Sequence, residues 1–290
     1  AIKEFIIKEL ARFSHLSLNE ALKFYFVFEG LDFGRKYSDI LEAINEQILN
    51  QASKIERNFN KLFKEQASDA IILLKRVARG KRGIFSLSKS THNAKSILNM
   101  LFNLEILKLE KTPQIPPIRI KGQKLKREIR RYKIQNKVQF SKGFYRFWFS
   151  FCADNALLKS PKLGARQKIL EFIKQNLERF YSFGFEQACA KLLAKTLNIE
   201  PNTISSYWQK GVEIDIFVNA RSKLIVGEVK YKEHKICKSL LTKLQFKCEQ
   251  CGLKPDYYAL FSLGGFSSEL ITNKGQNVWL FSLNDFEAVL

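Results

Sequence analysis

The sequence contains no apolar run of the roughly eighteen residues that a membrane-spanning helix needs. Charged residues also interrupt its opening segment, AIKEFIIKELARFSHL, every few positions, unlike the apolar core of a secretory signal. Cysteine is scarce: five residues, an odd number in a chain of 290, indicate reduced thiols rather than a disulfide framework. We therefore expect a cytoplasmic protein that does not contact a membrane.

Acidic residues are also fewer than basic ones. The chain has 28 Asp and Glu against 49 Lys and Arg, a net charge of +21, and a surplus of this size attracts polyanions. The surplus is uneven: residues 1–184 hold 36 basic against 17 acidic residues, whereas residues 185–290 hold 13 against 11. The two parts therefore have different tasks, and we expect DNA to be the partner of the basic one, with RNA as an open alternative.

Hydrophobic residues make up 46% of the chain and aromatic residues 13%, enough to build buried cores. Residues 1–66 place apolar residues at three- and four-residue steps, which predicts helices. The aromatic stretch GFYRFWFSFCADN, residues 143–155, is expected to be core rather than a surface that stacks nucleobases. Two helices, on either side of Gly184, and an alternation of strands and helices should follow, so we expect an α/β pattern within an α+β chain.

The stretch from 67 to 137 has the element order of a winged helix-turn-helix: a helix from Ser68 to Gly80, a second helix, a strand, a basic loop and a strand. Seven basic residues and one acidic residue lie between 121 and 133, a density that suits phosphate contacts. We expect DNA contacts from the start of the recognition helix and from the wing, at Lys89, His92, Lys95, Lys124, Lys126, Arg127, Arg130 and Arg131. The alternative is a protein-docking module with a solvated basic hairpin.

The segment GVEIDIFVNARSKLIVGEVKY, residues 211–231, predicts two strands joined by a turn at 221–222. Alternation puts Asp215 and Phe217 on one face and Ile214 on the other. With this turn, antiparallel pairing sets Asp215 across from Glu228, their Cβ atoms about 5 Å apart. Two carboxylates so close repel, and a divalent cation such as Mg²⁺ or Mn²⁺ is the usual remedy. Lys230, one strand step from Glu228, can orient an attacking water or stabilise charge on a phosphate.

This Asp…Glu-x-Lys arrangement, EID at 213–215 and GEVK at 227–230, resembles the PD-(D/E)XK nuclease superfamily. The resemblance implies a metal-dependent phosphodiesterase with a central mixed sheet flanked by helices. It also implies a metal-binding acid on the preceding helix, a position that Glu186 matches, and a supporting polar residue one helix later, which Gln245 matches.

Five segments in order look similar to the nuclease-like domain that follows a winged helix in archaeal-type P-loop ATPases: RYKIQNKVQFSKGFYRFWFSF, FGFEQACAKLL, EIDIFV, GEVKY and YYALFSLGGFSSEL. The resemblance covers about residues 68–290. The chain departs from the pattern in two ways, because it lacks a GxxxxGK[ST] loop and reads QNK where the family has an Asp after the RYKI strand. We therefore expect no ATP binding, and three parts: a helical segment 1–66, a winged helix 67–137 and a nuclease-like domain 138–290.

Two alternatives stay open at this point. His234, Cys237, Cys248 and Cys251 could hold zinc, but Cys237, Cys248 and Cys251 also fall on the inner face of one helix, which favours core residues. The expected function is a DNA-binding, Mg²⁺- or Mn²⁺-dependent nuclease. A non-catalytic DNA-binding regulator with a relic site, and a protein-interaction module, are the alternatives. The sequence does not decide whether a homodimer is needed to cut two strands.

Overall fold

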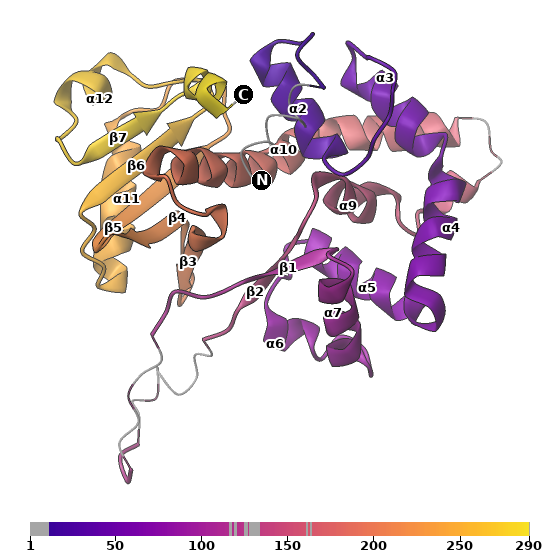
Figure 1. The fold of residues 1–290 in the computed structure, drawn as a ribbon, viewed down its shortest axis with the longest axis horizontal. Coiled ribbons are helices and arrows are strands. Elements are labelled where there is room, and N and C mark those ends of the chain that lie inside the picture. The colour runs from indigo at the N-terminus through magenta and orange to yellow at the C-terminus, as the bar shows by residue number, and fades with distance from the viewer. Residues whose placement is uncertain are drawn as a thin grey trace. The chain divides into compact units, whose positions relative to one another are not determined.

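The fold is taken from a computed structural model, which describes residues 12–115, 118, 121–124, 127, 134–160, 162 and 164–289 (Figure 1). The chain divides into two compact units. Unit 1 comprises residues 1–110 and 137–184, and unit 2 comprises residues 111–136 and 185–290. The three-part division expected from the sequence stays a prediction.

Unit 1 begins with the helices expected before residue 66. They are α2 (Leu18–Phe28), α3 (Ile40–Ile44) with a π-helical continuation (Asn45–Leu49), α4 (Ala52–Phe63) and a 3₁₀ turn (Lys64–Gln66). The start of α2 is set by a capping box, in which the Ser17 hydroxyl accepts a bond from the backbone N–H of Glu20 and the Glu20 carboxylate reaches back to Ser17.

The next elements follow the expected order of helices and strands, except that a further short helix lies in the connection between the two expected helices. They are α5 (Ala67–Ala78), α6 (Ile84–Leu87), α7 (Ala94–Asn103), β1 (Leu107–Glu110) and β2 (Lys137–Phe140). β1 and β2 pair antiparallel, and Gly83 forms a further bridge to Lys137. The helix α5 begins one residue before the expected start at Ser68, with Gln66 and not Ser68 at its N-cap. The strand expected at 131–134 lies almost entirely outside the described residues.

The aromatic stretch from 143 is core, as expected. It forms α9 (Gly143–Phe147), a π-helical turn (Trp148–Cys152) and, further on, a 3₁₀ turn (Ala156–Lys159). Trp148 and Phe149 are buried and pack their rings against Phe59 of α4, with ring centroids 6.0 and 5.0 Å apart. These rings therefore stabilise unit 1 instead of offering a stacking surface.

One helix, α10 (Ala165–Leu197), replaces the two helices expected around Gly184. Glycine usually weakens a helix, but here the absence of a side chain is needed. A Cβ atom on Gly184 would come within 2.6 Å of Cγ of Phe26, so the ring of α2 packs directly on the helix backbone. Packing against Phe26, and not helix propensity, therefore explains why a glycine lies inside α10.

Unit 2 is built on a mixed sheet in the order β3-β4-β5-β6-β7. Its strands are β3 (Ser205–Gln209), β4 (Val212–Ala220), β5 (Lys223–Lys230), β6 (Tyr257–Ser262) and β7 (Val278–Phe281). β3, β4 and β5 pair antiparallel, and β5, β6 and β7 pair parallel. The connecting helices are α11 (Lys238–Cys251) and α12 (Ser268–Asn273), and 3₁₀ turns lie at Pro201–Thr203 and Leu283–Val289.

Helices flank this sheet. Leu241, Leu244 and Cys248 of α11 are buried in one cluster with Val226 of β5 and Leu260 of β6. The part of α10 that belongs to unit 2 begins with Phe185, whose ring contacts Tyr231 and Phe286. The expected fold class, α+β with a mixed sheet flanked by helices, is confirmed. Within the stretches that the structure describes, no helix is both long and apolar enough to cross a membrane.

Candidate functional site

The hairpin of β4 and β5 turns where the sequence predicts. Ala220 pairs with Lys223, and the two residues between them, Arg221 and Ser222, have φ angles of 51° and 60°. Positive φ at both central positions is the geometry of a type I′ turn, whose twist matches that of the flanking strands. The expected register is therefore confirmed, and it runs without a break to the pair of Ile216 with Gly227.

A bulge in β4 begins where this ladder ends. Ser205 pairs with Phe217 and Tyr207 with Ile214, so two steps along β3 match three along β4. The extra residue lies at 215–216, and bulges often turn a side chain at a functional site. The Asp215 carboxylate then accepts a 2.9 Å hydrogen bond from the backbone N–H of Val229, beyond the last ladder pair.

The bulge also corrects the expected alternation of faces. Ile214 was expected on the face opposite Phe217, yet both contribute to the cluster around Val226, Ile214 as a buried member and Phe217 packed against it. A bulge adds one residue to a strand and so breaks the two-residue alternation. The two-residue alternation therefore does not hold between Ile214 and Phe217.

Glu228 is the most enclosed charged group of the site, with only 6% of its surface exposed. Its Oε1 atom accepts a 2.8 Å bond from Nζ of Lys230 on β5, and its Oε2 atom accepts a 2.7 Å bond from Nζ of Lys247 on α11. Buried carboxylates are stable only when paired in this way. Each oxygen of Glu228 therefore has its own ammonium.

Asp215 has the most informative electrostatics. Burial, followed by repulsion from Glu228, raises the pKa of Asp215 to about 6, against the opposing influence of the Val229 N–H and of Lys230 and Lys247. The effect of Glu228 places the two carboxylates within electrostatic reach, as the hairpin register predicts. The pair is thus an unfavourable concentration of negative charge that two lysines offset in part.

Lys230 connects this pair to α10. Burial lowers the pKa of Lys230, but the hydrogen bond and charge of Glu228, together with the charges of Asp215 and Glu186, outweigh it and raise the pKa overall. Burial and the charges of Glu186 and Asp215 also raise the pKa of the buried Cys189 thiol. Glu186 therefore acts electrostatically on the same site from α10, as its expected position on the preceding helix implies.

The polar contact from α11 to Glu228 comes from Lys247 and not from the expected Gln245. Gln245 is exposed and forms no hydrogen bond or ion pair with any described residue. Lys247 comes three residues after the buried Leu244 and directly before the buried Cys248. The sequence signal for Lys247 is its position at the edge of the buried face of an amphipathic helix.

The described residues contain no group of three or more His, Cys, Asp or Glu side chains that could hold a metal ion. This argues against the zinc alternative at His234, Cys237, Cys248 and Cys251. It also means that Glu186 does not join Asp215 and Glu228 in a set of three ligands, as the resemblance implied. Cys248 of α11 is buried in the core of unit 2, as expected, and Cys251 packs against this core. Cys237, however, is exposed and caps the start of α11, so its expected place on the inner face is wrong because the helix begins one residue later.

Two carboxylates are nevertheless enough for Mg²⁺ or Mn²⁺. Magnesium in proteins is commonly bound by one or two carboxylates, with waters and substrate phosphates as the other ligands. Asp215 and Glu228 supply hard oxygen donors, and Oδ1 of Asp215 accepts no hydrogen bond from any described residue. The donor set fits such an ion, which would take over part of the role of the two ammonium groups on Glu228.

The basic candidates outside the hairpin are exposed where they are described. Lys89 lies with its Nζ atom 4.5 Å from the ring centre of Phe85, and Lys95 is the second residue of α7. Lys124 and Arg127 are exposed. Lys126, Arg130 and Arg131 lie outside the described residues.

Residues 148–242 match the model of the family DUF234, which is described as archaeal and bacterial proteins of unknown function. No curated protein and no solved structure matches the chain. The matched stretch contains Glu186, Asp215, Glu228 and Lys230 and ends before Lys247. Because the family description names no activity, function is argued from the site.

Proposed function

We propose that the chain is a nucleic-acid-binding nuclease that depends on Mg²⁺ or Mn²⁺ and hydrolyses phosphodiester bonds. The observation that carries this proposal is the carboxylate pair: Asp215 accepts a bond from the backbone N–H of Val229, next to Glu228, and partial burial, followed by repulsion from Glu228, raises the pKa of Asp215 to about 6. Proteins rarely bury two acids together without a use, and perturbed carboxylates of this kind cluster at functional sites. Their place on adjacent strands, beside Lys230, matches the resemblance to the PD-(D/E)XK nucleases.

Asp215 and Glu228 would hold the metal ion, with Glu186 nearby on α10. When bound, a divalent ion supplies a Lewis acid for the phosphate and lowers the pKa of a bound water. Lys230 presents its ammonium within 2.8 Å of Glu228 and is positioned to donate to a phosphate oxygen on which charge builds. Lys247 holds the other oxygen of Glu228 from α11 and so fixes the orientation of the carboxylate.

The basic residues of the chain would hold the nucleic acid. The order α5, α6, α7, β1 and β2, with the bridge from Gly83 to Lys137, supports a winged helix-turn-helix. Lys89 and Lys95 then flank the start of the recognition helix, and Lys124 and Arg127 belong to the connection between β1 and β2 that would form the wing. These side chains would neutralise backbone phosphates, a sequence-independent contribution to affinity.

A second candidate function is nucleic-acid binding without cleavage. The double ion pair of Glu228 favours it, because an acid already satisfied by two ammonium groups has less need of a metal ion. Under this alternative Asp215, Glu228, Lys230 and Lys247 form a structural charge cluster, and only the basic surface acts.

Incubation of the protein with plasmid and short duplexes in Mg²⁺, Mn²⁺ or chelator separates the two candidates. The nuclease proposal expects cleavage with either ion, none in chelator, and none with Asp215→Ala, Glu228→Ala or Lys230→Ala, while mobility-shift binding persists. Glu249→Ala, an exposed acid on α11, is the matched control and should cleave normally. Binding without any cleavage would leave the second candidate, and the absence of binding would overturn both.

A further inference from the structure

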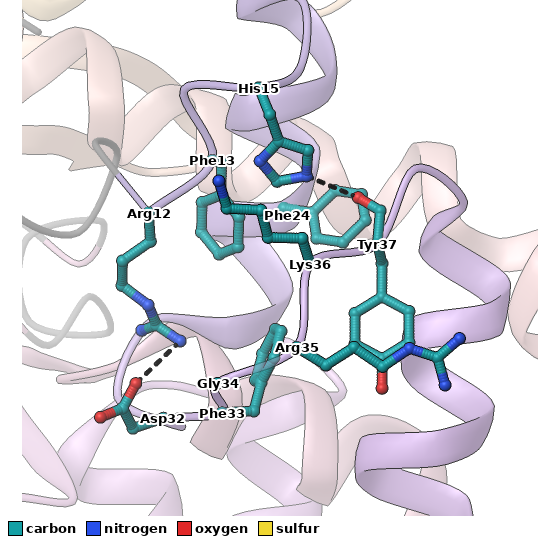
Figure 2. Close-up of a pocket in the computed structure, with 10 residues that line it drawn as sticks. All are labelled: Arg12, Phe13, His15, Phe24, Asp32, Phe33, Gly34, Arg35, Lys36 and Tyr37. Atoms are coloured by element: carbon teal, nitrogen blue, oxygen red, sulfur yellow. Dashed lines mark hydrogen bonds and ion pairs between the residues drawn. The ribbon is translucent and has the colours of Figure 1, made fainter.

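The cavity next to α2 in unit 1 has a wall made largely of groups with partners of their own (Figure 2). Arg12 pairs with Asp32. The rings of Phe13, Phe24 and Tyr37 are almost fully buried against their neighbours. A ligand in this cavity would have to displace such contacts, whereas unit 2 contains a buried polar group that has no contact to lose.

That group is the hydroxyl of Ser262, the last residue of β6. Ser262 is 0% exposed, and its Oγ atom forms no hydrogen bond with any described residue. A buried hydroxyl without a partner destabilises a protein, because it has given up its hydrogen bonds to water. Such groups are rare in folded proteins, so this one requires an explanation.

Ser262 lies beside the carboxylate site. β6 pairs parallel with β5 in a register that runs without a break and ends with Lys230 opposite Ser262 (Figure 1). Residues paired in this way point to the same face of the sheet, on strands about 4.8 Å apart. The hydroxyl is therefore one strand away from the Lys230 side chain and on the same face.

Packing against α11 confirms the common face. Leu260, two residues before Ser262, is buried in one cluster with α11. Glu228, two residues before Lys230, accepts its bond from Lys247 of the same helix. Since side chains two positions apart in a strand point the same way, Ser262 and Lys230 both lie on the side of the sheet where Glu228 is bound.

Lys230 is able to use a second acceptor. An ammonium group has three N–H donors on a flexible stem, and Lys230 gives one of them to Oε1 of Glu228 at 2.8 Å. The backbone N–H of Leu263 donates a 3.2 Å bond to the carbonyl oxygen of Lys230, which holds the end of β6 next to it. The ammonium therefore has further donors and a buried acceptor on the neighbouring strand.

We propose that Ser262 is a positioning residue, whose hydroxyl accepts a bond from the Lys230 ammonium when Glu228 binds a divalent ion; this inference rests on the proposed function. An ammonium beside Glu228 is repelled by a cation on the same carboxylate and loses part of its hydrogen bond there. Lys230 then needs another acceptor in a site shielded from water, and Ser262 supplies it. Held in this way, Lys230 still has a donor for a phosphate oxygen.

Stability without metal tests whether the hydroxyl lacks a partner in the unloaded site. Ser262→Ala removes a buried polar group that forms no bond, so the midpoint of thermal unfolding in chelator should rise by up to about 4 °C. Ser268→Ala, which removes an exposed hydroxyl on α12, is the matched control and should leave the midpoint unchanged. A lower midpoint for Ser262→Ala would overturn the inference, because the hydroxyl would then already have a partner.

Calorimetric titration with Mg²⁺ tests the role of the hydroxyl in the loaded site. Ser262→Ala should bind Mg²⁺ about tenfold more weakly than the wild type, since a hydrogen bond to a charged group contributes at least that factor. Ser262→Thr keeps the hydroxyl and should bind like the wild type, with thermal melting as the check on folding. In a Lys230→Met background, Ser262→Ala should have no effect on Mg²⁺ affinity, because the hydroxyl acts through Lys230.

The outcomes separate this inference from the proposed function. Equal Mg²⁺ affinity in the wild type and Ser262→Ala would overturn the role of Ser262 and leave the nuclease proposal standing. The same would follow if the effect of Ser262→Ala persisted in the Lys230→Met background. A wild type that neither binds Mg²⁺ nor cleaves would overturn both.

Discussion

The Nζ atom of Lys247 lies 2.7 Å from Oε2 of Glu228, although the two residues are 19 positions apart in the chain and belong to a helix and a strand. Together with Lys230, it holds both oxygens of a carboxylate that is almost fully buried. The two ammonium groups are the counter-charges of Glu228. A divalent ion and Lys247 therefore compete for the same oxygen if the nuclease proposal is correct.

Lys247→Met tests this competition. Removal of one ammonium leaves Glu228 with a single partner, so the free energy of unfolding without metal should fall by about 1–3 kcal/mol. The affinity for Mg²⁺ should rise, because Oε2 is no longer engaged. Denaturation in chelator and calorimetric Mg²⁺ titration measure the two effects.

Lys243→Met and Gln245→Ala serve as controls, since both residues are exposed on α11 and should leave both quantities unchanged. A Lys247→Met protein with wild-type stability and wild-type Mg²⁺ affinity would show that the contact has no energetic role.

Asp215→Asn should stabilise the protein at alkaline pH. The folded state binds the Asp215 proton more tightly than the unfolded state does, since its pKa is about 6 instead of 3.8. Stability from this group is present below pH 4 and is lost as the pH rises to about 6. Asn keeps an acceptor for Val229 without the charge, so the gain should be about 2–3 kcal/mol at pH 8 and close to zero at pH 4.

Chemical denaturation of both proteins at the two pH values measures the difference. Asp256→Asn provides a control of opposite sign, because the backbone N–H of Leu224 and then Lys223 lower the pKa of Asp256. That substitution should destabilise the protein at pH 8. An equal gain from Asp215→Asn at both pH values would contradict the assigned cause.

The hairpin could be predicted from the sequence because its signals are local. Alternating residues in β4 and β5 and a polar pair at 221–222 define two strands and a two-residue turn, and such a turn sets the register. The bulge at 215–216 could not be predicted from the sequence, because it depends on how β3 pairs with β4. The role of Lys247 could be predicted only in part. Its place between the inward residues Leu244 and Cys248 is a sequence signal, but its contact with Glu228 depends on how α11 packs on the sheet.

The continuity of α10 shows another limit of local reasoning. A glycine inside a helical pattern predicts a break, and only the ring of Phe26, far away in sequence, explains why the helix keeps it.

Gly184→Ala tests that explanation. On an exposed helix this change would stabilise by up to about 1 kcal/mol. Here the new Cβ atom would lie 2.6 Å from Cγ of Phe26, so we expect a loss of about 1–3 kcal/mol, measured by thermal or chemical denaturation. In a Phe26→Ala background the same substitution should be neutral or favourable. A stabilising Gly184→Ala in the wild type would mean that the ring moves without cost.

The wing residues make a quantitative prediction about salt. If Lys124 and Arg127 each neutralise a phosphate, replacing both by Ala should reduce the slope of log affinity against log salt by about 1.8, whatever the sequence of the duplex. Mobility-shift titrations at several salt concentrations measure the slope. An unchanged slope would favour a docking role for this segment over a DNA contact.

The two-residue connection at Arg221 and Ser222 has a consequence for how such a chain can diverge. Many side chains are tolerable there at modest cost, and Asn-Gly would suit the backbone better. A single inserted residue, however, would slide one strand past the other and carry Asp215 away from Glu228. The length of the turn thus sets the geometry of the acid pair. Substitutions at residues 221–222 keep that geometry, whereas an insertion or deletion there would change it.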